Sequence, residues 1–477
     1  MTNLQNKNLI NGRWIDSTSS EAITVTNPAT GQVIAAVPAA TSQQVQEAIR
    51  SSASAFTSWR EATAPYRSEI LLSISNIITS KDEEFAQLIT LEQGKPLTES
   101  RAEVAYSASY LRWFSGEAVR IQGDIVPADS PTKRILVLKQ PIGVAAAITP
   151  WNFPLAMIAR KMGAALAAGC TFISKPAPET PLTALKLGEV CIEAGVPPGV
   201  VSIVNGAPEM IGGELMRSPL VRKVSFTGST EVGKLLIKQS ADTVKKLTLE
   251  LGGNAPMIIC EDADLPKAVE AAILGKYRNA GQTCICVNRF LVHQDVATRF
   301  TELLVARSKE LTVGEGVSPN TQIGPLINDE AATKVSRLIS SAKSEGATIA
   351  LAPSVHPGGS RFISPTVITG VTPTMTIWRE EVFGPISSIT TFANDAEAVA
   401  LANDTTYGLA AYIFSANLAR AMKMSEKIDF GMVGINDSAI SAVQGPFGGV
   451  KESGYGREGS IYGVDEYLTL KYLSVEL

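Results

Sequence analysis

Short apolar runs alternate with segments of helical periodicity between residues 143 and 249. Each apolar run has the length of a buried strand, and each intervening segment is long enough for a helix. Strand, helix and strand repeated in this order predict parallel strands joined by right-handed crossovers. We therefore expect an α/β fold with a doubly wound parallel sheet. The predicted strands are 143–148, 171–174, 200–204, 223–226 and 247–249, and the predicted helices are 155–168, 181–194, 208–216 and 230–240.

A second alternation of the same kind begins near residue 255 and predicts a second α/β unit. Its pattern is less regular, with glycine-rich turns between the apolar runs. The chain closes on a β-like tail, 468–477. The predicted strands are 255–259, 290–292, 386–392, 412–414 and 433–435, and the predicted helices are 265–279, 296–311 and 330–346.

The front of the chain is mainly helical and shows no obvious chemistry. It opens with a hairpin signal around an Asn11-Gly12 turn, and residues 27–31 form a second turn. Thr41 and Gln44 form a capping box at the start of the first helix. Further helical patterns run over 66–90 and 99–119.

Residues 121–140 form an extended segment with prolines at its edges. Such a segment has two interpretations on its pattern alone. It is either an arm that adds to the sheet of a neighbouring subunit or an edge hairpin inside one subunit.

Composition narrows the class of protein. The chain has 477 residues, of which 45% are hydrophobic and 18% charged, as is ordinary for a soluble globular protein of several domains. A formal net charge of -4 gives no reason to expect nucleic acid or an anionic membrane as a partner. The polar first residues carry no secretion signal, and no apolar run is long enough to span a membrane. We therefore expect a cytoplasmic protein.

Cysteine and histidine usage restricts the chemistry further. Five cysteines in a chain of this length do not predict a disulfide framework, and none has zinc-finger spacing. The two histidines, His293 and His356, stand far apart and are expected at the surface. The sequence thus predicts no metal site and no Cys-His nucleophile pair.

Two of the cysteines, Cys284 and Cys286, lie one residue apart in the run 281–289. A thiol acts as a nucleophile only as its thiolate, in a partly exposed and positively charged setting. Arg278 and Arg289 could supply that setting. Two small cysteines in a loop are the alternative interpretation, and a nucleophile here would need a base other than histidine.

Polar residues follow several of the predicted strands, where a parallel sheet binds its ligands. Asn152 sits in a turn fixed by two prolines, which suits an oxyanion donor or simply a turn. Lys175 follows the second strand and could reach a nucleotide, or it could be solvated. Gly228 and Ser229 open a helix whose free N–H groups favour a phosphate.

Glu250 leaves the fifth strand just before two glycines. A carboxylate in an apolar setting has a raised pKa and can act as a general base, whereas a solvated glutamate is the alternative. The later glycine-containing runs 380–385 and 446–451 permit a close backbone approach, and each is also consistent with a simple loop.

Taken together, these stretches resemble the aldehyde dehydrogenase superfamily over essentially the whole chain. Seven motifs occur in the order that is usual for that family. They are Pro150-Trp151-Asn152-Phe153-Pro154, Ser174-Lys175-Pro176, Phe226-Thr227-Gly228-Ser229, Glu250-Leu251-Gly252-Gly253, Gly281-Gln282-Thr283-Cys284, Glu381-Val382-Phe383-Gly384-Pro385 and Pro446-Phe447-Gly448-Gly449.

The resemblance implies a role for each group. Cys284 would attack an aldehyde, Asn152 and the backbone N–H of Cys284 would hold the oxyanion, and Glu250 would activate the water that releases a carboxylate. A non-catalytic structural or binding member is the remote alternative. The implied contacts of an NADP or NAD cofactor are Thr149, Trp151, Lys175, Pro178, Gly228, Ser229, Leu251, Glu381 and Phe383.

Within the superfamily, residues 281–289, 160–163 and 431–436 resemble the succinate-semialdehyde dehydrogenases. The resemblance implies that Arg160, Arg278 and Ser441 clamp the distal carboxylate of the substrate, since guanidinium groups pair well with carboxylates. Structural ion pairs are the alternative role for the arginines. Glutarate semialdehyde or another ω-carboxy aldehyde is the alternative substrate.

Three further expectations come from the resemblance. Cys286 would form a reversible disulfide with Cys284, or it is a small packing residue. Many NAD-preferring members carry a glutamate three residues after the cofactor lysine, where this chain has Pro178 with Glu179 one step later, which favours NADP. The implied domains are a dinucleotide-binding domain (1–120 and 141–253), a catalytic domain (254–440) and an oligomerisation arm (121–140 and 465–477) that makes a homodimer or homotetramer.

Overall fold

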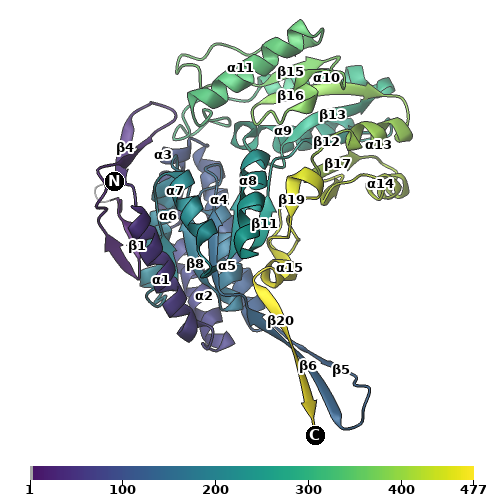
Figure 1. Cartoon of the computed structure of the whole chain (residues 1–477). Helices are drawn as coiled ribbons and strands as arrows, with labels where there is room; N and C mark the ends of the chain where they lie inside the picture. The colour runs from purple at the N-terminus through teal and green to yellow at the C-terminus, as the bar shows by residue number, and fades with distance from the viewer. Residues whose placement is uncertain (1–3) are drawn as a thin grey trace.

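The computed structural model describes residues 4–477 as two α/β units with a β-arm that projects away from both (Figure 1). The first unit is built on an eight-stranded sheet whose five central strands are parallel, as predicted. In sheet order these are β11 (Lys246–Glu250), β10 (Val221–Thr227), β7 (Val144–Ile148), β8 (Thr171–Lys175) and β9 (Val201–Ile203).

The strand order reverses between β7 and β10, because β8 and β9 extend the sheet to one side and β10 and β11 to the other. Such a reversal opens a crevice at the carboxyl ends of the two strands. The residues after β7 and β10 therefore border this crevice. The connecting helices are α5 (Ala156–Ala168), α6 (Pro181–Glu193), α7 (Pro208–Arg217) and α8 (Thr230–Ser240).

Antiparallel strands close both edges of this sheet. The predicted hairpin β1 (Asn8–Ile10) and β2 (Arg13–Ile15) adds to β9, with Asn11 and Gly12 in the left-handed region at its turn. At the other edge β19 (Gly454–Tyr455) pairs with β11. The segment 441–464, which the predicted domain boundaries left unassigned, thus contributes a strand to the first sheet and the helix α15 (Ser460–Asp465).

Four helices from the front of the chain pack beside the first sheet. The predicted capping box of Thr41 and Gln44 is confirmed at the start of the first of them. The helical pattern over 66–90 is two helices and not one, because the chain breaks at Lys81. The helices are α1 (Ser42–Trp59), α2 (Ala64–Ser80), α3 (Asp82–Gln93) and α4 (Leu97–Ala118), and a separate hairpin is formed by β3 (Ala22–Thr26) and β4 (Val33–Pro38).

The second unit has a seven-stranded sheet that is parallel except at one edge. Strands β14 (Thr348–Leu351) and β15 (Thr366–Thr369), the last two at one side of the sheet, were not predicted, because each has only four residues. The remaining strands, in sheet order, are β16 (Ile386–Phe392), β13 (Val287–His293), β12 (Ala255–Ile259), β17 (Ala410–Phe414) and β18 (Met432–Ile435).

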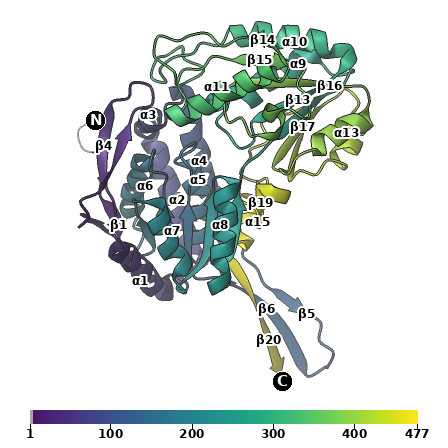
Figure 2. The same ribbon diagram turned by 45° about the horizontal axis from the view of Figure 1, so that its top comes forward.

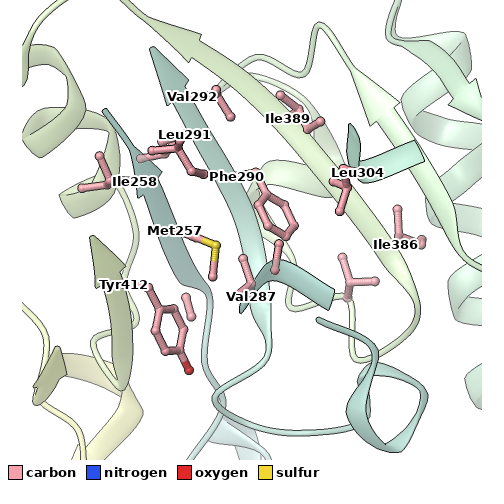
Figure 3. Close-up of a cluster of buried hydrophobic side chains, with 14 of the residues drawn as sticks. Met257, Ile258, Val287, Phe290, Leu291, Val292, Leu304, Ile386, Ile389 and Tyr412 are labelled. Carbon is pink, nitrogen blue, oxygen red and sulfur yellow. The ribbon is translucent and has the colours of Figure 1, made fainter. Parts of the chain in front are cut away.

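Apolar side chains from the central strands of the second sheet fill its core. Figure 3 shows Met257, Phe290 and Tyr412 among them, and all three are fully buried. The helices that cover this sheet are α9 (Leu265–Tyr277), α10 (Gln294–Lys309), α11 (Asp329–Ser344), α12 (Thr376–Arg379), α13 (Asp395–Asn403) and α14 (Leu418–Ser425).

His293 is buried at the end of β13, not at the surface as expected. Its ring nitrogen accepts a hydrogen bond from the Asp295 backbone at 3.3 Å, so the imidazole caps α10. Over residues 4–477 no group of three histidine, cysteine or carboxylate side chains is placed to hold a metal ion. No helix in the same range has the length and apolar character needed to cross a membrane.

The arm is a three-stranded antiparallel sheet that joins the region after α4 to the end of the chain. Its strands are β5 (Asp124–Val126), β6 (Lys133–Pro141) and β20 (Leu468–Glu476), and Figures 1 and 2 show them extending beyond the first unit. Several large apolar side chains on the arm face solvent, among them Ile125 (80% exposed), Leu470 (70%) and Tyr472 (60%).

Candidate active site

An unusual turn places Cys284. Asn279 and Ala280 have left-handed backbones, with φ of 52° and 55°, and Gly281 follows with φ of 78°. This conformation costs roughly 1–2 kcal/mol for each non-glycine residue. Polar side chains hold the turn: the Asn279 N–H donates to Glu99 Oε2 at 2.8 Å, and Gln93 Nε2 donates to Asn279 Oδ1 at 3.0 Å.

Asn152 is tied directly to this turn. Its side-chain Nδ2 donates to the Gln282 carbonyl at 3.0 Å, and its own carbonyl accepts from Asn279 Nδ2 at 3.0 Å and from Lys95 Nζ at 2.7 Å. Asn152 is buried, and among the described residues its Oδ1 has no hydrogen-bond partner. The end of β7 and the cysteine loop are thus held together as one rigid group.

The front helices complete this group, although their sequence shows no obvious chemistry. Lys95 and Glu103 form a fully buried ion pair at 2.6 Å. Glu103 Oε1 also accepts from the backbone N–H groups of Leu155 and Ala156, at 2.9 and 3.2 Å, at the start of α5. In the sequence, Lys95 lies in the Gly94-Lys95-Pro96 turn and Glu103 in the helical pattern that follows it. This spacing is compatible with an ion pair between the two residues, but it does not indicate a contact with Asn152.

Cys284 lies where two cavities meet. The larger cavity has a volume of about 740 Å³ and the smaller about 270 Å³, and Cys284 lines both. Six of the predicted cofactor contacts line the larger cavity: Trp151, Gly228, Ser229, Leu251, Glu381 and Phe383. The predicted substrate residues Arg160, Arg278 and Ser441 line the smaller one, together with Tyr106, Phe153 and Phe447.

The larger cavity fits a dinucleotide. Ser229 caps α8, whose N-terminal N–H groups attract a phosphate. Glu381 accepts from the Gly253 N–H at 2.9 Å, and the rings of Trp151 and Phe383 meet edge to face at 5.7 Å. Burial raises the pKa of Glu381 to about 7, against the effect of that hydrogen bond.

Three predicted cofactor residues, Thr149, Lys175 and Pro178, do not line this cavity in the part of the chain that is described, whereas Glu179 does. Burial lowers the pKa of Lys175 to about 8, and the charge of Glu179 opposes that shift. Thr149 is buried with its hydroxyl oxygen free of protein partners within residues 4–477. It therefore retains a hydrogen-bonding group next to the crevice.

Glu250 sits at the end of β11 and is buried. Neither of its carboxylate oxygens has a hydrogen-bond partner in the described chain. Burial raises its pKa well above the ordinary range, and Glu458 adds to the increase, while Arg160 and Lys161 oppose it. A buried carboxyl with a raised pKa, whose charge acts on the Cys284 thiol, has the properties of a general base.

Glu458 is a site residue that the sequence analysis did not find. It forms buried ion pairs with Arg160 and Lys161. Burial favours a raised pKa for Glu458, but these two cations outweigh it and lower the pKa. Glu458 lies in a glycine-rich run far along the chain, and no spacing or periodicity connects it with residues 160 and 161.

The two predicted clamp arginines differ in their surroundings. The charge of Arg160 is matched by Glu458, and its guanidinium lies 4.5 Å from the centre of the Phe447 ring. Arg278 stands over the Phe153 ring at 5.2 Å and forms no ion pair within residues 4–477. Its guanidinium is therefore the group in the smaller cavity that is available to a carboxylate.

Burial dominates the properties of the Cys284 thiol. It raises the pKa to about 12, although Arg160 and Arg278 both act to lower it. Arg289 does not contribute as expected, because strand β13 directs it into the core. There its guanidinium donates to the Asn254 and Ala402 carbonyls, at 3.0 and 2.8 Å.

A thiol between a dinucleotide-sized cavity and a smaller cationic cavity, carried by two α/β sheets, is the arrangement of an enzyme that binds a nucleotide cofactor beside a small substrate. The chain belongs to the aldehyde dehydrogenase family, whose model matches residues 14–473. The resemblance drawn from the seven motifs is thereby confirmed.

Three relatives show how close the similarity is. The NADP(+)-dependent succinate-semialdehyde dehydrogenase GabD of Escherichia coli is 48% identical over 98% of this chain and 97% of its own. A glutarate-semialdehyde dehydrogenase of Pseudomonas putida is also 48% identical, over 98% and 97%. The crystal structure of the succinate-semialdehyde dehydrogenase of Burkholderia pseudomallei superposes with a TM-score of 0.98, at 49% identity over 99% of this chain and 98% of that one.

The approach of Gly253 to the cysteine loop gives a direct test of the site. A Cβ at Gly253 would lie 2.2 Å from the Cys284 carbonyl oxygen, so Gly253→Ala must displace the loop. Because small misplacements of a reacting group are costly, we expect kcat/KM for an aldehyde to fall by about 100-fold or more. The rate of NADPH or NADH formation measures this effect.

Gly212→Ala is the matched control, since nothing lies within 4 Å of a Cβ at that position in α7. This variant should keep the activity of the unmodified enzyme. Wild-type kcat/KM in Gly253→Ala would contradict the placement of the loop.

Proposed function

We propose that the protein oxidises succinate semialdehyde to succinate with NADP or NAD. The observation that carries this proposal is the guanidinium of Arg278, which forms no ion pair within residues 4–477, in a cavity of about 270 Å³ that opens at Cys284. A small aldehyde with a carboxylate at its far end matches both the size and the charge of this cavity. The succinate-semialdehyde dehydrogenases among the relatives support the same substrate.

Glutarate semialdehyde is the second candidate substrate. A further cavity of about 110 Å³ lies beyond the first, shares Arg278 and Ser441 with it and is bordered by Ser438. This volume would accommodate the additional methylene of a five-carbon semialdehyde. The Pseudomonas putida relative, named for glutarate semialdehyde, is as similar to this chain as the Escherichia coli relative.

The reaction begins at Cys284, whose sulfur attacks the aldehyde carbon. Because its pKa is raised to about 12, the thiol must lose its proton to water as the sulfur attacks, and the charges of Arg160 and Arg278 favour the thiolate. The Asn152 side-chain amide and the backbone N–H of Cys284 stabilise the oxyanion of the resulting tetrahedral adduct. The residues that line the larger cavity would hold NADP or NAD, and the cofactor would supply the acceptor for the hydride of the former aldehyde carbon.

The hydride transfer leaves a thioester on Cys284. Glu250 removes a proton from water, the resulting hydroxide attacks the thioester carbon, and the bond to sulfur breaks. Succinate leaves with one oxygen from water, and the thiol is restored. The net reaction consumes one aldehyde, one oxidised cofactor and one water, and it produces one carboxylate, one reduced cofactor and protons.

The first α/β unit then serves as the dinucleotide-binding domain, and the second supplies the catalytic cysteine. We infer a preference for NADP, because Pro178 replaces the carboxylate that repels a 2′-phosphate, and the Escherichia coli relative is named for NADP(+). Glu179 lies at the cavity wall, but the neighbouring Lys175 charge offsets it.

The arm supports a homodimer or homotetramer. Its solvent-facing apolar residues Ile125, Leu470 and Tyr472 would be covered by a second copy of the chain.

The carboxylate-binding role of Arg278 can be tested by Arg278→Met. Hydrogen bonds to a charged group contribute about 1.5–3 kcal/mol, so the KM for succinate semialdehyde should rise roughly 10- to 100-fold. Butanal has the same chain length without the carboxylate, and its kinetic constants should change little. The measurement is steady-state kinetics on four- and five-carbon semialdehydes and butanal, with NADP and NAD in parallel.

Arg299→Met is the control for this series, because Arg299 is an exposed residue that pairs with the exposed Glu302. Equal losses for butanal and for the semialdehyde in Arg278→Met would contradict the clamp. A higher kcat/KM for the five-carbon substrate would favour the second candidate.

Replacing Glu250 by glutamine should separate the two halves of the reaction. Glutamine cannot activate water, so Glu250→Gln should give a single burst of reduced cofactor, close to one per active site, followed by a much slower steady state. Rapid-mixing absorbance measures the burst. A steady-state rate like that of the unmodified enzyme would rule out Glu250 as the base.

The pH dependence follows from the raised pKa of Glu250. Its carboxylate form appears only as the pH rises above the ordinary range of a glutamate, so thioester hydrolysis in the unmodified enzyme should speed up with pH through that interval. The Glu250→Gln variant should lose this rise.

Charges on the arm should prevent assembly. The double variant Leu470→Lys and Tyr472→Lys places like charges on the face that would pack against another copy, and we expect it to sediment as a monomer. The matched control is Val355→Lys, which changes a fully exposed apolar residue away from the arm. Sedimentation velocity of the unmodified protein at the monomer mass would contradict the proposed assembly.

A further inference from the structure

Lys276 lies in the last turn of α9 and is completely buried. Its Nζ lies 3.3 Å from Cys286 Sγ, and within residues 4–477 this is the only hydrogen bond that the ammonium group makes. Removing an ammonium from water is unfavourable unless a partner compensates its charge. The thiol of Cys286 is the group in position to do so.

Other fully buried lysines in this protein have oxygen partners. Lys95 pairs with Glu103, Lys161 pairs with Glu458, and Lys223 bonds to Thr248 and lies 3.8 Å from Glu466. Lys276 differs from these three because its partner is a sulfur atom. The Lys276 nitrogen and the Cys286 sulfur thus lie at hydrogen-bond distance, and within residues 4–477 no carboxylate is at ion-pair distance from Lys276.

Two further contacts fix the position of Cys286 beside Lys276. Its backbone N–H donates to the Thr283 carbonyl at 3.1 Å, and its Sγ also lies 3.4 Å from the Lys276 carbonyl. Burial raises the pKa of the Cys286 thiol, and Lys276 is the main group opposing that increase. The charged groups that act on this thiol from neighbouring elements are Lys276, Glu381 and Arg278.

We propose that Cys286 and Lys276 form a redox modification site, in which peroxide oxidises the cysteine and the lysine amine then closes a sulfur–nitrogen bond. The Cys286 sulfur first attacks hydrogen peroxide; the O–O bond breaks, and a sulfenic acid and water are formed. The neutral Lys276 amine then attacks the sulfur, the S–O bond breaks, and a second water leaves with a proton from nitrogen. Sulfur loses two electrons, and peroxide gains them.

The lysine is better placed than Cys284 to trap the oxidised sulfur. Its nitrogen is already 3.3 Å away, whereas a bond between Cys284 and Cys286 would have to close across one intervening residue and open the turn between Thr283 and Cys286. The cross-link would join the last turn of α9, next to Arg278, to the loop that carries Cys284. This proposal does not depend on the identity of the substrate.

The test uses full-length protein with Cys284→Ser, which removes the alternative disulfide. After treatment with hydrogen peroxide, the intact mass should fall by about 2 Da, the loss of two hydrogens that a sulfur–nitrogen bond requires. Trypsin should fail to cleave after Lys276, and the resulting peptide should be linked to Cys286. Dithiothreitol should reverse both changes, as expected for an oxidised sulfur that a thiol can attack.

Lys276→Arg in the same background is the matched variant, since it keeps a cation but lacks a nucleophilic amine. It should show no loss of mass and should instead accumulate sulfenic or sulfinic acid at Cys286. If this variant does not fold, the peptide map of the Cys284→Ser protein decides alone. Normal cleavage at Lys276 after oxidation, or an equal mass loss in Lys276→Arg, would overturn the proposal. The experiment measures mass and not catalysis. Its result is therefore independent of whether the protein has the proposed activity.

Discussion

The carbonyl of Asn152 is the point on which the active-site geometry depends. It accepts hydrogen bonds from Lys95 and from Asn279, and so it joins the front helices, the end of β7 and the cysteine loop. These segments are widely separated in the sequence, and all of the groups involved are buried. An unpaired polar group here would cost about 1–3 kcal/mol, so the three segments stabilise one another in a single arrangement. The two cavities meet at Cys284 because this arrangement fixes the loop between them.

Burial also determines the electrostatics of the site. It raises the pKa of both Cys284 and Glu250, so each is held toward its neutral form when the site is at rest. The cations nearby do not cancel this effect, since Glu458 already takes up much of the charge of Arg160 and Lys161. Arg278 keeps its positive charge available to a ligand. The site thus combines a largely neutral reacting centre with one cationic anchor, a combination suited to an aldehyde that carries a distant carboxylate.

Sequence patterns predicted the features that depend on local chain properties. The apolar runs gave the strands β7 to β11, and the residues after them were correctly expected at the carboxyl edge of the sheet. Strands β14 and β15, of four residues each, are too short to give that signal, and the break at Lys81 has no proline or glycine to mark it. Arg289 and Glu458 show the limit most clearly. Arg289 is close to Cys284 in sequence, but its side chain points into the core. Glu458 is remote from Arg160 in sequence, but the two side chains form an ion pair. In both cases the packing of the strands, and not the distance along the chain, determines which side chains meet.

The left-handed turn at Asn279 and Ala280 has a consequence for how the protein comes to be active. The second unit supplies this turn, but the groups that hold it, Glu99 and Gln93, belong to the front helices. The second unit alone would therefore lack the contacts that compensate the backbone cost of the turn. The thiol acquires its reactive surroundings only after both halves of the chain have docked, and an incompletely folded chain carries an ordinary cysteine. The docking of the two units therefore completes the surroundings of Cys284.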